Sequence, residues 1–203
     1  MLLKAVLVHL EYVFIAVTVG FILGLVLGIL LSRIPKFSGL IMGIISLLQT
    51  VPGIVFIGVL FIYVGMKPIS VIIALSIYAM FPVLKNTYTG IMSVDKGYVE
   101  AATGCGMSSM QALLRVELPL AMPHVIAGLR LATIYTVSWA VLAAMIGQGG
   151  LGDFIYQGVD SNNNTLIIGG AIPAALIAIG AGALIDRLQK RVTPGGMRGG
   201  ERA

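Results

Sequence analysis

Charged residues are scarce in this sequence, and their scarcity excludes most classes of soluble protein. Only 10% of the 203 residues are charged, whereas 58% are hydrophobic. Soluble globular domains carry charge on about a quarter of their residues. We therefore expect lipid rather than water to be the solvent for most of the chain. The net charge of +5 does not make nucleic acid an expected partner, because the position of charges along such a chain matters more than their sum.

Residues that form disulfides, metal sites and nucleotide sites are also few. The single cysteine, Cys105, cannot form an internal disulfide, and His124 has no Cys or His near it to complete a metal site. No P-loop motif is present, so we expect no ATP site in this chain. Residues 147–152 match G-x-G-x-x-G, but they follow an apolar segment instead of a strand, which favours a flexible loop. We expect no catalytic residue, metal or cofactor here, which leaves transport or anchoring.

Long uncharged stretches predict a bundle of five transmembrane helices. A helix needs about 20 apolar residues to span the hydrocarbon, and backbone groups in lipid must bond within their own segment. Lys4 precedes the first stretch as in a signal peptide, but no A-x-A cleavage site follows that stretch, so we expect it to be retained. The fold class is therefore all-α and integral to the membrane, with helices predicted at residues 10–32, 38–65, 68–92, 120–146 and 164–186.

The positive residues predict the orientation of this bundle. Lys4 and Lys67 fall in one set of predicted loops, and all other Lys and Arg residues fall in the other set. Because cytoplasmic loops are enriched in Lys and Arg, we expect the N-terminus outside and the C-terminus in the cytoplasm. Residues 95–119 then form a cytoplasmic loop, and residues 147–164 form an external segment. Residues 1–190 are expected to be one domain, followed by a basic, flexible tail over 191–203.

Small residues and one proline predict how the helices pack. Small residues at every fourth position let helix backbones approach closely. The first and last predicted helices have this spacing at Gly20, Gly24, Gly28, Ala174, Ala178 and Gly182. Proline removes a backbone donor, so the second helix should kink at its proline, and such a kink either lines a cavity or only packs. The candidate pore-lining residues, which could equally be packing residues, are Gln49, Thr50, Pro52, Trp139 and Met145.

The 95–119 loop has the pattern of a short helix, a turn and a second helix. Asp95 is placed to cap the first helix, and Gly106 permits a left-handed turn at its end. Ser108 or Ser109 is placed to cap the second helix. Pro119 then starts the next membrane helix, where its missing N–H costs nothing. Such a folded loop suits docking into the groove of a partner.

This loop resembles the EAA loop of ABC importer permeases, whose pattern is E-A-A-x3-G-x9-I-x-L-P. The sequence matches it throughout except that Val116 replaces isoleucine. In that family the loop is the coupling helix that docks onto a separate ATPase subunit. The resemblance implies that this chain contacts its ATPase through Glu100, Ala101, Ala102, Gly106, Val116, Leu118 and Pro119.

Other segments resemble the osmoprotectant permeases that take up glycine betaine, carnitine or choline. They are N-T-Y-T-G-I at 86–91, L-P-L-A-M-P at 118–123, A-G-L-R at 127–130 and I-G-Q-G-G-L-G-D at 146–153. The resemblance implies a type I ABC importer permease in the cytoplasmic (inner) membrane of a bacterium or archaeon. It also implies two ATPase subunits that hold ATP and Mg, and a second permease copy or a paralogous permease. Because this chain is too short to include a binding domain, it implies a separate extracytoplasmic substrate-binding protein.

The residues alone are also compatible with other functions. A related ABC importer would carry another small solute, such as an amino acid. A secondary transporter needs ionisable residues inside the membrane, and Arg130, near the cytoplasmic end, is the only strong candidate. A membrane anchor needs no coupling loop. Since the aromatic residues form no cluster in the loops, we expect the aromatic cage for a quaternary ammonium group in the binding protein, and a pore that is only loosely selective.

Overall fold

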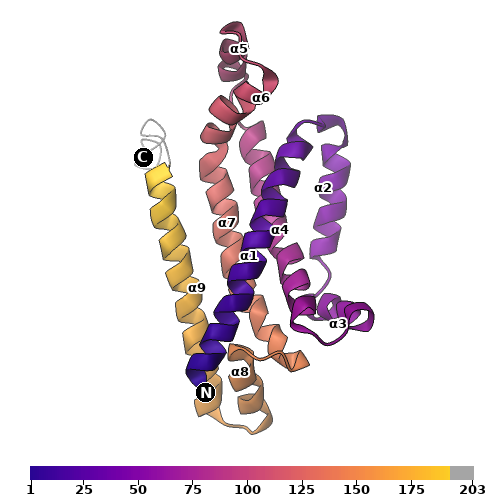
Figure 1. The fold of residues 1–203 in the computed structure, drawn as a ribbon, viewed down its shortest axis with the longest axis vertical. Helices are drawn as coiled ribbons and strands as arrows, with labels where there is room; N and C mark the ends of the chain where they lie inside the picture. The colour runs from indigo at the N-terminus through magenta and orange to yellow at the C-terminus, as the bar shows by residue number, and fades with distance from the viewer. Residues whose placement is uncertain (193–203) are drawn as a thin grey trace.

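The computed structural model describes residues 1–192, and these residues contain helices and connecting turns but no strand. The expected all-α class is therefore confirmed for the described residues, while the predicted tail lies outside them from residue 193 on. The elements (Figure 1) are α1 Leu2–Ser32, α2 Pro35–Gln49, α3 Gly53–Val64, α4 Pro68–Met92, α5 Lys96–Gly104, α6 Ser109–Ala112, a π-helical turn Leu113–Glu117, α7 Leu118–Ala140, a 3-10 segment Val141–Ile146, α8 Leu151–Asp160 and α9 Asn164–Val192.

Four helical segments within residues 1–192 are long and apolar enough to cross a membrane. They are α1, α4, α9 and the continuous run Ser109–Ile146, which includes α7. The α2–α3 pair passes the same test only when its two helices are taken together, and they meet at 89°. The described residues therefore contain four candidate spans, or five where this bent pair counts as one, and the sequence predicts five.

The predicted single helix over 38–65 is wrong, because the chain breaks at residues 50–52 instead of kinking. Pro52 has φ −58° and ψ 133°, which is outside the helical region. It lacks the N–H that a continuous helix would need, and its ring disfavours helical backbone at Val51. We call residues 50–52 the break.

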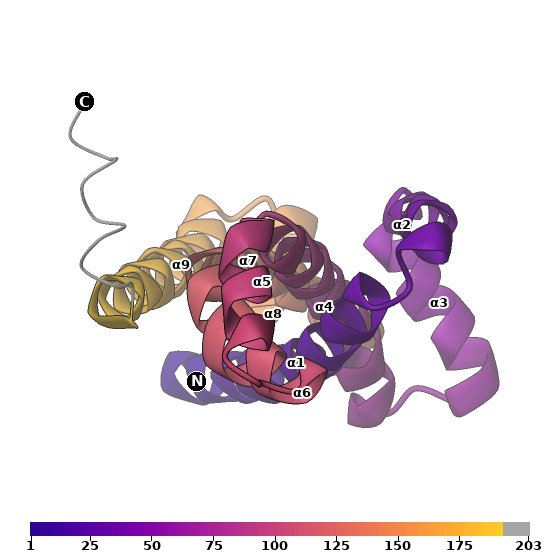
Figure 2. The same ribbon diagram turned by 90° about the horizontal axis from the view of Figure 1, so that it is seen from above.

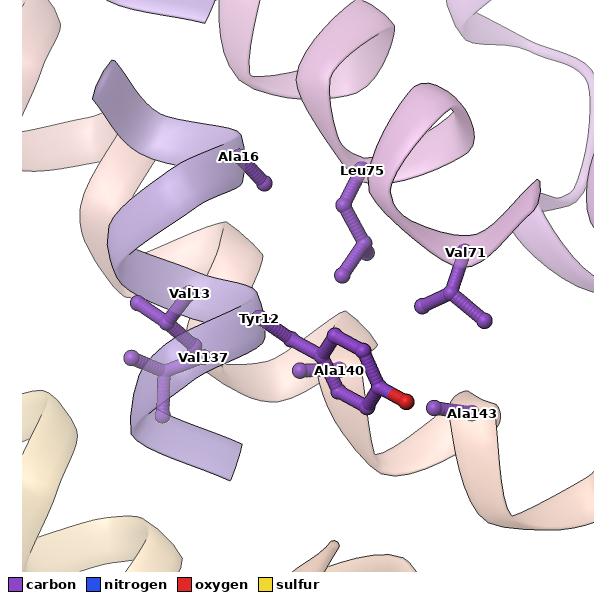
Figure 3. Packing of buried hydrophobic residues seen from close by; sticks show 8 residues of the cluster. All are labelled: Tyr12, Val13, Ala16, Val71, Leu75, Val137, Ala140 and Ala143. Carbon is purple, nitrogen blue, oxygen red and sulfur yellow. The ribbon is translucent and has the colours of Figure 1, made fainter. Parts of the chain in front are cut away.

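Helices α1, α4 and α7 form the centre of the molecule. Viewed from above, α9 lies on one side of them and the α2–α3 pair on the other (Figure 2). Figure 3 shows one part of this centre, in which the ring of Tyr12 from α1 lies among side chains of α4, α7 and the 3-10 segment. Its buried members are Tyr12, Val13, Ala16, Val71, Leu75, Val137, Ala140 and Ala143.

The glycines of α1 bring it very close to α4, as their spacing predicts. A Cβ atom added at Gly20 would lie 2.6 Å from Ala79 Cβ, and one added at Gly24 would lie 2.6 Å from the Met80 carbonyl oxygen. In α9 the same spacing gives a looser contact, since the atom nearest to a Cβ added at Gly182 would be Ile134 Cδ1, at 3.5 Å. The close approach therefore belongs to α1 and α4, and α9 packs more loosely on α7.

Helix α1 begins eight residues before its predicted start at residue 10. The polar residue His9, directly before that predicted start, lies within the helix. The ring is completely buried, and its Nε2 lies 3.1 Å from the Val137 carbonyl oxygen of α7. A hydrogen bond of this kind compensates for the burial of a polar ring, so the helix continues through it.

The predicted external segment 147–164, which was expected to begin with a flexible loop over 147–152, contains the ten-residue helix α8. Leu151 at its start is completely buried. Its carbonyl oxygen would lie 2.7 Å from a Cβ added at Gly170 of α9, so α8 and α9 touch closely. A glycine-rich stretch predicts a turn, but it does not reveal that the following apolar residues pack onto another helix.

The two ends of the bundle differ in what they carry. Figure 1 shows the N-terminus beside α8 at one end, and α5 and α6 at the opposite end. The described end of α9 points toward the end that carries α5 and α6. The 95–119 loop is therefore on the opposite side of the bundle from the N-terminus.

Candidate functional site

The first half of the 95–119 loop is the helix and turn that the sequence predicts. Asp95 caps α5, with Oδ1 accepting a hydrogen bond of 2.7 Å from the Gly97 N–H. After α5 the chain turns through Gly106 at φ +82°, and the Met107 N–H returns to the Ala102 carbonyl oxygen at 3.1 Å. Only glycine adopts this backbone conformation at little cost. The turn fixes the direction of the second half of the loop relative to α5.

The second half runs without interruption into α7. Ser108, rather than Ser109, is the cap: its Oγ accepts from the Gln111 N–H at 3.3 Å, and Gln111 Oε1 accepts from the Ser108 N–H at 2.8 Å. The π-helical turn follows at once. Pro119 is thus the second residue of α7 and lies within a continuous helical run. The sequence had predicted that this membrane helix starts at residue 120. A π turn interrupts the regular bonding ladder, which accommodates the missing N–H of proline.

The residues expected to contact the ATPase fall into two groups. Glu100, Ala101 and Gly106 are exposed at the tip of the loop. Ala102 is buried at 6% exposure, where α5 meets α6 and the π turn. The residues at the junction with α7 are Val116 and Leu118, both half-buried, and Pro119, which is exposed. The tip thus offers a surface to a partner, while Ala102 holds α5 against the rest of the loop.

One residue pair that the sequence does not reveal ties this loop to α1. Arg33, directly after α1, makes an ion pair of 2.7 Å with Glu117, the last residue of the π turn. No sequence signal identifies this pair, because its members are 84 residues apart.

A cavity of about 190 Å³ lies where the end of α2 meets α4 and α7. Two of the expected pore residues, Gln49 and Trp139, line it. Thr50 and Pro52 belong to the adjacent break, and Met145 is an exposed residue of the 3-10 segment; none of these three lines the cavity. The lining residues that the sequence did not single out are Leu75, Tyr78, Pro82, Tyr135 and Thr136.

Two of the aromatic side chains that line the cavity also contact the break or the residue directly after it. The Tyr78 hydroxyl donates to the Val51 carbonyl oxygen at 2.6 Å, which satisfies a backbone group in the break. The Tyr78 ring lies 3.9 Å from that of Trp139 and 5.5 Å from that of Phe56, centroid to centroid. Trp139 also lies so close to Gly53 that a Cβ added there would be 3.3 Å from its ring. The aromatic cluster that the loops lack is therefore inside the bundle.

The cavity is electrically neutral in its lining. No Asp, Glu, Lys or Arg is among the residues around it. Arg130, the candidate for ion coupling, is paired with Asp186 of α9, with Nε 2.7 Å from Oδ1. Among residues 1–192, no group of three or more His, Cys, Asp and Glu side chains is placed to hold a metal ion. The cavity thus provides aromatic faces and a few neutral polar groups.

Comparison with known proteins identifies a family and relatives that this chain resembles. The model of the binding-protein-dependent transport system inner membrane component family matches residues 20–196. The carnitine transport permease protein OpuCB of Listeria monocytogenes is 40% identical over 190 residues, which are 94% of this chain and 87% of that protein. The glycine betaine/carnitine/choline transport system permease protein OpuCB of Bacillus subtilis (strain 168) is 39% identical over 191 residues, 94% of this chain and 88% of its own.

Among solved structures, an inward-facing form of the MetNI methionine ABC transporter contains a chain with a TM-score of 0.84 and 22% identity, over 95% of this chain and 96% of that one. At this identity the likeness concerns the fold alone. The family match covers most of the chain, and its relatives are named as transport permeases, which are translocation subunits and not enzymes. The chain therefore belongs to the family of binding-protein-dependent transport system inner membrane components, as a multi-pass permease subunit.

Proposed function

We propose that this chain is the membrane-spanning subunit of an ATP-driven importer for the quaternary ammonium osmoprotectants glycine betaine, carnitine and choline. The observation that carries the substrate class is the identity of 39–40% over 94% of the chain to two permeases named for these compounds. Similarity of this extent, without large gaps in coverage, supports a shared substrate class as well as a shared fold.

The proposed assembly contains two ATPase subunits, two permease subunits and an extracytoplasmic binding protein. The second permease is another copy of this chain or a paralogue, and ATP and Mg are held by the ATPases. The exposed Glu100, Ala101 and Gly106 at the tip of the 95–119 loop form the contact with an ATPase. The junction residues Val116, Leu118 and Pro119 transmit movement of the tip into α7. Their arrangement in one continuous helical run supports this role.

The proposed orientation places the 95–119 loop in the cytoplasm and the N-terminus outside the cytoplasmic membrane of a bacterium or archaeon. Arg33, Lys96, Arg115 and Arg187 belong to the segments at the loop end of the bundle, whereas Lys4 and Lys67 belong to those at the other end. This asymmetry supports the orientation through the preference of Lys and Arg for the cytoplasmic side. Closure of the ATPases then moves the two 95–119 loops together, and the bundle alternates access between the two sides.

The substrate class is tested by uptake in cells that lack other osmoprotectant systems and that carry this chain with its cognate ATPase and binding protein. Labelled glycine betaine, choline or carnitine should accumulate in an ATP-dependent manner. The alternative is a permease for another small solute such as an amino acid. Uptake of methionine together with no uptake of the three ammonium compounds would reject the proposed substrate class and retain the transport mechanism.

A further inference from the structure

We propose that the cavity lined by Tyr78, Tyr135 and Trp139 receives the trimethylammonium group of the substrate on its way through the membrane, and that Tyr135 determines specificity for it. This inference rests on the proposed function, since it concerns the same substrate class. It differs from the expectation of an aromatic cage in the binding protein and a pore that is only loosely selective.

The lining of the cavity suits a small cation that has no hydrogen atoms to donate. Three aromatic side chains surround a volume of about 190 Å³, and no Asp, Glu, Lys or Arg lines it. Pockets for drug-sized ligands are about 300–1,000 Å³, so this one fits a smaller solute. Aromatic faces attract quaternary ammonium groups through the ring quadrupole, and the attraction is strongest where water is excluded.

The polar groups around the cavity are few and neutral. The Thr136 hydroxyl donates to the Ala132 carbonyl oxygen at 2.7 Å, and the Tyr78 hydroxyl donates to Val51 as described. Both hydroxyl oxygens keep lone pairs that can accept, and Gln49 and the Tyr135 hydroxyl are the other neutral acceptors of the lining. A primary ammonium carries three donors that must leave water and find acceptors. A trimethylammonium group has no such requirement, so the aromatic faces alone suffice to hold it.

Tyr78 and Trp139 have a structural role beside the proposed one. Tyr78 bonds the backbone of the break, and Trp139 lies against Gly53. Replacing either residue is expected to disturb the junction of α2 and α3 as well as the cavity. They are therefore poor residues on which to test substrate binding.

Tyr135 has no such second role in the part of the chain that the structure describes. Its side chain lines the cavity and is 52% exposed. Within residues 1–192 it makes no hydrogen bond and no ring contact. Its ring is thus available to a ligand. Tyr63 of α3 is a matched control, because it is another exposed membrane-helix tyrosine, at 83%, and it does not line the cavity.

Binding is tested with choline and its neutral isostere 3,3-dimethyl-1-butanol. The importer with its ATPase subunits is placed in nanodiscs without the binding protein, and fluorescence is titrated. Trp139 is the only tryptophan of this chain, so subtracting the response of the ATPase subunits alone to the same titration isolates its signal. Choline should change this emission saturably and bind at least about threefold more tightly than the isostere. Burial of apolar surface alone would favour the neutral isostere, so equal or weaker binding of choline, or no saturable change, overturns the proposal.

Specificity is tested by three variants measured for choline binding and for transport by the complete importer. Tyr135→Leu should weaken binding by about 3- to 30-fold, because it removes the aromatic face while retaining an apolar side chain. Tyr135→Phe retains the face and should bind as the unmodified importer does, and Tyr63→Leu should do the same. Equal losses in Tyr135→Leu and Tyr135→Phe would assign the effect to the hydroxyl and overturn the cation–π role. No loss in Tyr135→Leu overturns it as well.

The amount of assembled complex and its basal ATP hydrolysis show whether each variant has folded. Failure of this inference and failure of the proposed function give different results. If the unmodified importer takes up none of the three ammonium compounds, the proposed function fails. If it takes them up and Tyr135→Leu transports them with an unchanged apparent affinity, only the inference about the cavity fails.

Discussion

Arg33 and Glu117 form an ion pair, with Nη2 of the guanidinium donating to Oε2 of the carboxylate at 2.7 Å. The Glu117 side chain is only 7% exposed, whereas that of Arg33 is 41% exposed. Arg33 follows the last residue of α1, and Glu117 is the point at which the 95–119 loop passes into α7. The pair therefore connects two helices at the end of the bundle where the ATPase is proposed to dock, and a displacement of the loop would act on α1 through it.

Replacing Arg33 should uncouple ATP hydrolysis from substrate delivery. Arg33→Gln leaves the Glu117 carboxylate nearly buried and without its cation, at a cost of about 1–3 kcal/mol. We expect ATP hydrolysis stimulated by the loaded binding protein to fall about fivefold or more. The measurement is ATPase activity of the purified importer with and without saturating binding protein and substrate.

Two variants separate the pair from a general effect of charge. Lys36→Gln removes another cation close to Arg33, one that makes no ion pair within the described residues, and it should have little effect. The double variant Arg33→Gln/Glu117→Gln removes both charges and should recover most of the stimulation, because the two amides can still hydrogen-bond to each other and neither leaves a buried charge unpaired. Equal losses in Arg33→Gln and Lys36→Gln would show that the pair has no special role.

Gly106→Val should abolish substrate-stimulated ATP hydrolysis while the chain still inserts into the membrane. A Cβ atom at Gly106 would meet no atom within 4 Å, so the cost comes only from the backbone, at φ +82°. A β-branched residue there costs on the order of 1–3 kcal/mol. The turn would change and α5 would point away from its ATPase contact.

Gly104 provides the matched control for this turn. A Cβ added there also meets nothing within 4 Å, but Gly104 is the last residue of α5 and has no positive φ. Gly104→Val should therefore retain most of the coupling. Gly106→Asn should be intermediate, since asparagine tolerates left-handed backbone better than valine does. Normal coupling in Gly106→Val would contradict the role of the turn.

Local features of the 95–119 loop could be predicted from the sequence because each depends on residues close together in the chain. Asp95, Gly106 and Ser108 occupy the cap and turn positions that their side chains and backbone preferences indicate. The glycines of α1 predicted a close helix contact for the same reason, since their spacing fixes one helix face.

Features that depend on distant contacts could not be predicted. The 89° break occurs at Pro52, where Tyr78 bonds the backbone and Trp139 lies against Gly53; a kink is the result that a proline alone predicts. Helix α8 packs its first residue against α9, and His9 is buried within α1 beside the Val137 carbonyl oxygen of a distant helix. The cavity joins three helices, so the sequence identified Gln49 and Trp139 but not Tyr135.

Gly24→Leu should prevent the assembly of a stable bundle. A Cβ at this position would lie 2.6 Å from the Met80 carbonyl oxygen and 2.8 Å from Val83 Cβ, so α1 and α4 would have to separate. Overpacking of this kind costs about 1–3 kcal/mol or more, and α4 cannot move without disturbing α7. The measurement is the yield of monodisperse importer complex after extraction. Gly43→Leu in α2 is the control, because a Cβ there meets nothing within 4 Å, and a similar loss in both variants would contradict the packing argument.

Cys105 should react with a membrane-impermeant maleimide only when the reagent reaches the cytoplasmic side. It is the only cysteine of the chain and it is exposed, next to Gly106 in the 95–119 loop. The orientation argued from Lys and Arg predicts labelling in inverted vesicles and none in intact cells. A Cys105→Ser chain should not be labelled at all. In that background, Lys67→Cys places a thiol in the exposed turn between α3 and α4 at the opposite end of the bundle, and it should be labelled in intact cells. A docked ATPase would lower the labelling of Cys105 in inverted vesicles, and its removal should restore it. If Cys105 is labelled in intact cells while Lys67→Cys is protected, the orientation is reversed.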